Sequence, residues 1–207
     1  MRTLTLSLAA LLLCMGPIAR ADAVYQFSVN TSSISGTAGS LDFNFNPGPI
    51  ISQSASLDVF NFASDGTLAG SPSLTGDVSG GPLPAKVTFD NGTAFNDYFE
   101  GFTYGSSLVF DVRLYGPAVN SPSGAATSGS TFAFSMFSDA AGTIPVLTTD
   151  TTNGFAATID INLDGSTTVT NNSSETKATP VPEPSGLMLL GSGLAVFAGM
   201  IRRKLFR

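Results

Sequence analysis

The sequence contains no histidine, no tryptophan and a single cysteine, Cys14. Without histidine, the chain cannot form a Ser-His-Asp triad, a histidine-ligated metal site or an imidazole general base. A lone cysteine allows neither a disulfide within the chain nor a thiolate zinc centre. Only 12% of the residues are charged, which is about half the share in an average globular protein. These absences exclude the enzyme classes and metal sites that depend on histidine or cysteine.

The balance of charge is acidic, with 15 Asp and Glu against 9 Lys and Arg in 207 residues. Such a chain lacks the basic surface that neutralises phosphates, so we expect no nucleic-acid partner. The length fits one domain. Most of the basic residues lie near the two ends of the chain: Arg2, Arg20, Arg202, Arg203, Lys204 and Arg207.

Residues 1–23 have the features of a secretory signal peptide. Arg2 supplies the positive start, and residues 4–13 form an apolar stretch that is too short to cross a bilayer. Small residues then offer two cleavage positions, so that the exported chain would begin at Asp22 or Val24. The alternative is a buried amino-terminal helix.

An uncharged segment, residues 186–201, lies near the other end and is followed by the basic residues Arg202, Arg203, Lys204 and Arg207. As a helix it would rise about 24 Å, short of a hydrocarbon core of about 30 Å. Basic side chains that snorkel and local thinning of the bilayer can absorb this mismatch. We therefore predict a single transmembrane helix whose basic end stays in the cytoplasm.

The motif Val181-Pro182-Glu183-Pro184 precedes this segment. Motif, short apolar helix and basic cluster together resemble the PEP-CTERM sorting signal, over residues 181–207. The resemblance implies that an exosortase of a Gram-negative bacterium that makes extracellular polysaccharide recognises Pro182, Glu183 and Pro184 and processes the chain as its substrate. The alternative is a proline-rich linker in an ordinary single-pass protein.

Apolar and polar residues alternate between residues 24 and 170, with turn residues between the runs, which indicates half-buried strands. The pattern predicts an all-β, jelly-roll-like β-sandwich ectodomain of about nine to eleven strands. Residues 171–180, which are polar and lack aromatics, are predicted to be a linker. The alternating apolar positions are Tyr25, Phe27, Val29, Leu41, Phe43, Phe45, Leu57, Val59, Val87, Phe89, Leu108, Phe110, Val112, Leu114, Phe132, Phe134, Met136, Ile159, Ile161 and Leu163.

A second resemblance covers more of the chain. The runs at residues 35–37, 41–48 and 95–99, read as Ser-Gly-Thr, Leu-Asp-Phe-Asn-Phe-Asn-Pro-Gly and Phe-Asn-Asp-Tyr-Phe, are similar to ectodomains of a group of PEP-CTERM proteins of unassigned activity. This resemblance implies no active site.

One short motif could bind a cation. Asp160, Asn162 and Asp164, followed by Gly165, match the first half of a calcium-binding loop. Position twelve is Asn171 instead of glutamate, and no flanking helices are predicted. The alternative is a strand that ends in an Asp-Gly hairpin, and we expect no cofactor.

Carboxylates near residue 97 are the remaining catalytic candidates. Asp97 and Glu100, with Asp90 nearby, could form a glycosidase pair, or they could belong to a solvated loop. Lys86 could serve as a base for a serine, although no motif supports this. Sugars could stack on tyrosines, for which the candidates are Tyr98, Tyr104 and Tyr115.

Two functions remain open on the sequence. The first is an exported, non-enzymatic protein of the cell surface or extracellular matrix that associates with exopolysaccharide in a biofilm. The second is a carbohydrate- or calcium-binding β-sandwich module.

Overall fold

The computed structural model describes residues 21–182 and residue 193. Most of the predicted signal peptide, the apolar segment 186–201 apart from residue 193, and the basic cluster lie outside these residues. In the part of the chain that is described, no helix is long and apolar enough to cross a membrane.

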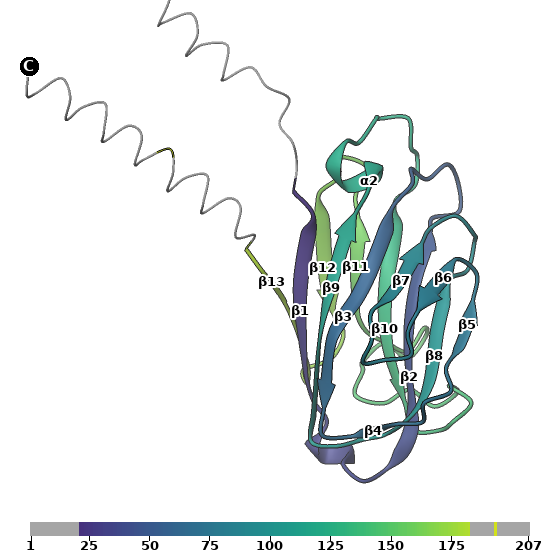
Figure 1. The fold of residues 1–207 in the computed structure, drawn as a ribbon, viewed down its shortest axis with the longest axis vertical. Coiled ribbons are helices and arrows are strands. Elements are labelled where there is room, and N and C mark those ends of the chain that lie inside the picture. The colour runs from purple at the N-terminus through teal and green to yellow at the C-terminus, as the bar shows by residue number, and fades with distance from the viewer. Residues whose placement is uncertain (1–20, 183–192, 194–207) are drawn as a thin grey trace, which may run out of the picture.

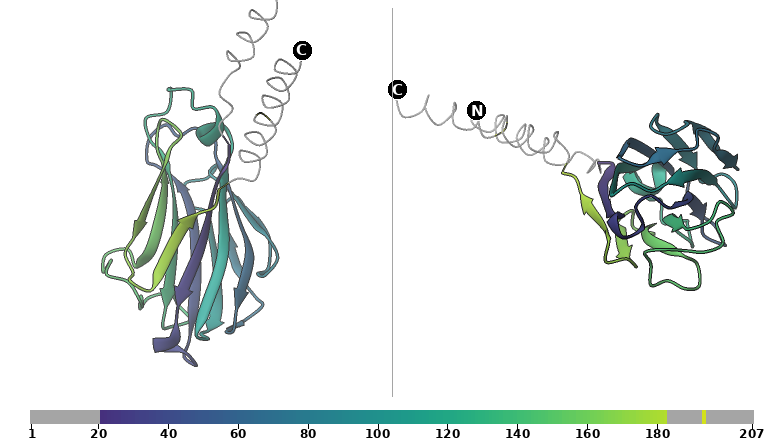
Figure 2. Two further views of the ribbon diagram at one scale, coloured as in Figure 1. Left: turned by 90° about the vertical axis from the view of Figure 1, so that its left-hand side faces the viewer. Right: turned by 90° about the horizontal axis from the view of Figure 1, so that it is seen from below.

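The described chain is all-β and forms two antiparallel sheets that face each other (Figures 1 and 2). In order across the sheet, the first consists of β13 (Thr176–Pro180), β1 (Ala23–Asn30), β9 (Ser107–Tyr115), β3 (Ser56–Ser64), β7 (Val87–Asp90) and β6 (Val78–Gly80). The second consists of β12 (Thr167–Asn171), β11 (Phe155–Ile161), β10 (Ser130–Phe137), β2 (Ala38–Pro47), β8 (Asp97–Thr103) and β4 (Thr67–Leu68), and β5 (Ser73–Thr75) also pairs with β8. Within residues 21–182, helical structure is limited to η1 (Ser32–Ile34) and α2 (Pro117–Asn120).

The predicted alternation of apolar residues is confirmed, because these side chains fill the space between the sheets. Phe27 of β1 stacks on Phe110 of β9, with ring centroids 4.7 Å apart. Across the core, Phe27 meets the edge of Phe132 from the second sheet at 5.7 Å. Leu163 is the exception: it lies beyond the end of β11, in the turn, and remains 49% exposed.

The segment predicted to be a linker, residues 171–180, is instead part of the fold. Asn171 ends β12, and Thr176–Pro180 forms β13, which pairs with β1 at the edge of the first sheet. Polar residues suit this position because an edge strand exposes one face and one edge to solvent. Thr176 is buried, whereas Lys177 and Thr179 are exposed. The domain therefore continues to the sorting motif without a flexible stalk.

The strand β8 corrects a second expectation. A solvated loop was one of the two interpretations of the residues around Asp97. Instead, Asp97–Thr103 forms a strand between β2 and β4 in the second sheet. The buried side chain of Asn96 fixes the start of this strand. Its amide nitrogen donates to the carbonyl oxygens of Phe45 and Thr93 at 2.9 and 3.0 Å, and its amide oxygen accepts from the backbone of Asp77 at 2.8 Å.

Replacing Asn96 should therefore destabilise the domain strongly. Asn96→Ala removes three hydrogen bonds to the backbone, one of them buried and two partly buried, and a buried group left without a partner costs about 1–3 kcal/mol. We expect a loss of about 3 kcal/mol in the free energy of unfolding, measured by urea denaturation. Asn153→Ala, in an exposed turn, is the control and should change little. Equal effects of the two substitutions would contradict this account.

Candidate functional site at the chain termini

The two ends of the described chain leave the domain next to each other. Strand β1 is bonded to β9 on one side and to β13 on the other, with Tyr25 opposite Pro180. Beyond the strand, the backbone nitrogen of Val181 donates to the carbonyl oxygen of Val24 at 2.8 Å. The start of β1 and the end of β13, and with them Asp22 and Val181, therefore lie at the same end of the first sheet, the upper end in Figure 1. We call this the terminal end.

The predicted sorting motif begins where β13 stops. Val181 and Pro182 are described, and Val181 is 40% exposed. Glu183 and Pro184 lie outside the described residues, as do Arg202, Arg203, Lys204 and Arg207. The backbone bond of Val181 thus ties the first residue of the motif to the fold.

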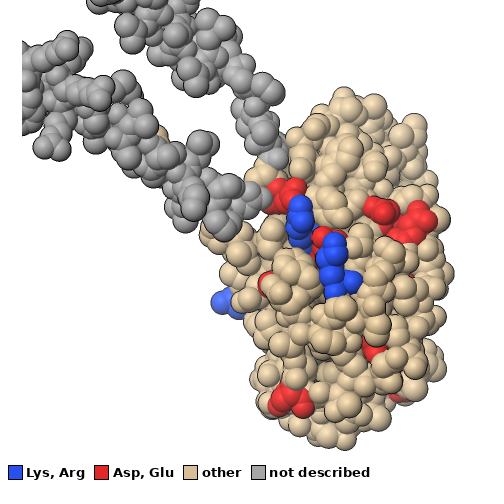
Figure 3. Space-filling view, viewed as in Figure 1, with Lys and Arg blue, Asp and Glu red and all other residues tan. Residues whose placement is uncertain are grey.

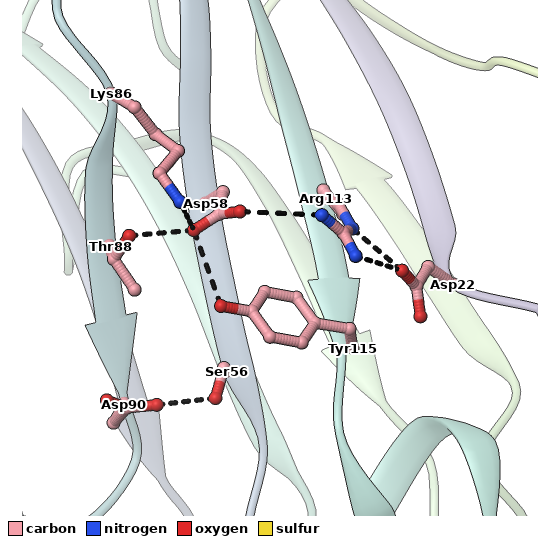
Figure 4. A network of polar contacts seen from close by, with 8 residues as sticks. All are labelled: Asp22, Ser56, Asp58, Lys86, Thr88, Asp90, Arg113 and Tyr115. Carbon is pink, nitrogen blue, oxygen red and sulfur yellow. Dashed lines mark hydrogen bonds and ion pairs between the residues drawn. The ribbon is translucent and has the colours of Figure 1, made fainter.

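Ion pairs hold the first described residues in place (Figure 4). The carboxylate of Asp22 accepts from the guanidinium of Arg113 at 2.6 and 2.7 Å, and from the amide of Asn120 at 2.9 Å. Arg113 stands on β9, and Asn120 ends α2. The residue before β1 is therefore bound to two other elements of the terminal end.

The same arginine joins Asp22 to a second carboxylate, Asp58 on β3. Arg113 lies 3.8 Å from Asp58, and Lys86 lies 3.3 Å from it. Asp58 also accepts hydrogen bonds from Thr88 at 2.8 Å and from Tyr115 at 3.4 Å. Its side chain is only 4% exposed, so these partners offset the cost of removing the charge from water.

The positive charges of Arg113 and Lys86 are therefore already paired. Near the centre of the face in Figure 3, basic side chains lie beside acidic ones. The guanidinium of Arg113 also sits over the ring of Tyr115, 4.7 Å from its centroid. Sequence reasoning missed this network, because its members come from β3, β7 and β9 and from the residues just before β7 and β1. Its contacts indicate that it fastens the chain start to the sheet.

The proposed glycosidase pair does not come together. Asp97 and Glu100 are three residues apart on one strand, so their side chains lie on opposite faces of the second sheet. Glu100 points into the core, where it accepts from the hydroxyl of Tyr98 and from the backbone of Gly70 at 2.8 Å. Asp90 belongs to the other sheet and accepts from Ser56.

The buried tyrosine beside Glu100 is part of a structural relay. The backbone nitrogen of Leu83 donates to the Tyr98 hydroxyl at 2.9 Å, and that hydroxyl donates to Glu100. Burial, together with the hydrogen bond to Glu100, raises the pKa of Tyr98. Tyr104 is also buried and donates to the backbone of Ser40. Neither ring presents a face on which a sugar could stack.

Asp97 has a different partner, Asp42 on β2, and sequence reasoning missed this contact. Strand β2 pairs with β8, and the two carboxyl groups hydrogen bond to each other on the outer face of the second sheet. Two carboxyl groups can form such a bond only if one of them keeps its proton. Burial, and then the contact with Asp97, raises the pKa of Asp42 above its ordinary value of 3.8. The strands are too far apart in sequence for any local signal to reveal the pair.

The possible calcium loop has the contacts of a hairpin. Asp160 accepts from Thr131 at 2.6 Å, and the amide of Asn162 donates to Ser166 and to Thr168, each at 3.0 Å. Asp164 accepts from the backbone of Ser166 at 2.9 Å, and Gly165 has a φ of 79°. These bonds close the turn between β11 and β12. Among the described residues, no group of three Asp or Glu side chains could hold a metal.

The ion-pair network predicts a specific loss of stability. Arg113→Met leaves the buried Asp58 with fewer partners and removes the bond to Asp22, so we expect a loss of about 2 kcal/mol in the free energy of unfolding. Lys177→Met removes the same charge from an exposed position on β13 and should change it by much less. The measurement is urea denaturation of both variants. An equal effect would contradict the role assigned to Arg113.

The carboxyl pair predicts a dependence of stability on pH. Because folding raises the pKa of Asp42, its contribution is most favourable below pH 3.8 and is lost as the pH rises. Asp42→Asn keeps a hydrogen-bond donor for Asp97 without a charge. It should raise the melting temperature at pH 8 and have little effect at pH 4. A lower melting temperature at pH 8 would refute this assignment.

Comparison with known proteins adds one match. Residues 180–204 match the family model described as the PEP-CTERM protein-sorting motif. A search of curated proteins gave no match, and neither did a search of solved structures. The matched segment begins at the last residue of β13, in agreement with the resemblance of residues 181–207. The chain therefore carries a PEP-CTERM protein-sorting motif, as expected of an exosortase substrate that is sorted to the cell envelope.

Proposed function

We propose that this protein is an exported, non-enzymatic component of the cell surface or extracellular matrix, which an exosortase processes at residues 182–184. The match of residues 180–204 to the sorting motif carries this proposal. The motif marks the chain as a substrate of the sorting enzyme, and the candidate catalytic carboxylates Asp97 and Glu100 lie on opposite faces of a sheet. Association with exopolysaccharide follows from the resemblance alone.

The proposal includes the jelly-roll-like arrangement expected from the sequence. Strand β2 pairs with β10 in one sheet, and β3 pairs with β9 in the other. Each pair encloses the next along the chain, as in a long hairpin folded over on itself. This nesting supports the description.

Export begins, in this proposal, with removal of a signal peptide after Ala21. Of the two positions that the sequence leaves open, cleavage after Ala23 would remove Asp22 and with it the bonds to Arg113 and Asn120. It would also remove the first paired residue of β1, since Ala23 lies opposite Leu114. Cleavage after Ala21 preserves these contacts.

The amino terminus of the exported protein should therefore be Asp22. Amino-terminal sequencing of material from the periplasm or cell surface tests this directly. A start at Val24 would contradict the choice of position, and an intact Met1 would contradict the signal peptide.

The sorting step predicts a dependence on the motif and on the enzyme. The intact mass of the exported chain should fall by that of the segment after the motif in cells that have the exosortase, but not in cells that lack it. Glu183→Ala should prevent this fall. Glu175→Ala, which removes the same charge just before β13, is the matched control and should leave processing unchanged. Unchanged mass with and without the exosortase would refute the proposal.

A further inference from the structure

The registers of both sheets bring several loops to the terminal end. Ser56 lies opposite Tyr115 and Asp90, so the β2–β3 loop and the β7–β8 loop lie beside the end of β9. Ser130 lies opposite Ile161 and Pro47, which adds the β11–β12 turn. All of these loops lie at the end of the sheets where the chain enters and leaves the domain.

Most of the large apolar side chains exposed in the described residues belong to this end. Ile50 and Ile51 in the β2–β3 loop are 67% and 63% exposed. Phe95 in the β7–β8 loop is 52% exposed, and Leu163 in the β11–β12 turn is 49% exposed. Ile144, at 57%, lies in the β10–β11 loop at the opposite end.

The loops that present these side chains are held by hydrogen bonds. The carbonyl oxygen of Ile51 accepts from the backbone nitrogens of Thr127 and Ser128 at 2.9 and 3.1 Å. The amide of Asn91 bonds the backbone of Gln53 and of Ala55, each at 2.9 Å, which joins the β7–β8 loop to the β2–β3 loop. The isoleucines therefore project from a braced backbone while their side chains remain in solvent.

The chain that follows Val181 limits how far the terminal end can lie from the uncharged segment 186–201. The backbone of Val181 is bonded to Val24, and the uncharged segment 186–201 starts five residues later. Five residue steps span at most about 18 Å even when fully extended. If that segment enters a bilayer, the terminal end is held within this distance of the lipid.

We propose that the terminal end rests on the surface of a lipid bilayer, with Ile50, Ile51, Phe95 and Leu163 at the level of the headgroups. This proposal rests on the membrane segment that the proposed function includes. Moving apolar side chains out of water at such a boundary lowers the free energy. These contacts therefore strengthen the membrane attachment that a terminal segment supplies. The domain is thereby oriented with the motif at the membrane surface, where an exosortase could reach it.

Charge favours neutral lipid over anionic lipid at this surface. The described basic residues are Lys86 and Arg113, which pair with Asp58 and Asp22, and Lys177 on β13. The β11–β12 turn carries Asp164 beside Leu163. Docking should therefore be driven by apolar contact and should be no stronger on anionic vesicles.

Tryptophan fluorescence can test the proposal, because the chain has no tryptophan of its own. The full chain is placed in phosphatidylcholine vesicles with a single tryptophan introduced by Ile51→Trp. Ile144→Trp, at a similarly exposed site on the opposite end, is the matched control. We expect emission of the first variant to shift to shorter wavelength and to be quenched by brominated lipid, and emission of the second to remain as in water.

Flotation of the same samples separates the two proposals. If the chain floats with the vesicles and both variants give equal quenching or none, the docking surface is wrong while the membrane segment stands. If the chain does not float, the membrane segment is wrong and the docking proposal falls with it. A shift of the Ile51→Trp emission that depends on protein concentration without lipid would assign this end to a second copy of the chain instead. Ile50→Trp repeats the measurement one residue away and should behave as Ile51→Trp does.

Discussion

The burial of phenylalanine rings between the two sheets is the interaction on which the rest of the structure depends. Phe27 and Phe110 stack within the first sheet, and Phe134 of the second sheet meets Phe110 at 5.0 Å. Each ring removes a large apolar area from water, and the edge-to-face contacts fix how the sheets lie on one another. With its only cysteine at position 14, the chain depends on this core instead of on disulfides.

The pairing of β1 with β13 fixes where the chain enters and leaves the domain. It closes one edge of the first sheet and brings the two ends of the described chain together. The same pairing keeps the first residue of the sorting motif bonded to the fold, because Val181 donates to Val24. A linker would let the domain take any orientation, whereas a strand sets which end of the domain faces the motif. This geometry places the exposed isoleucines at the end of the domain where the motif begins.

Several buried polar groups connect separate parts of the structure. Asp58 is neutralised by basic residues and connects β3 to the residue before β1 through Arg113. Glu100 and Tyr98 join loops to β8, and Asn96 joins β2 to the same region. These residues would look like catalytic candidates if only their residue types were considered. Their partners show that they hold loops and strand ends, because buried polar groups need hydrogen bonds to remain in a core.

Local patterns in the sequence determined most of the strands, their inward faces and the sorting motif. Alternation identifies Phe27, Phe43 and Phe110 as core residues because side chains on a strand change faces at every residue. Residues 171–180 were misassigned because an edge strand with one exposed face has the composition of a linker. Only the tertiary structure decided that Asp42 contacts Asp97, that Arg113 joins Asp22 to Asp58, and that Ile51 lies at the end where the chain leaves. Each of these contacts depends on which distant strands pair, and strand pairing is decided by the burial of the whole core at once.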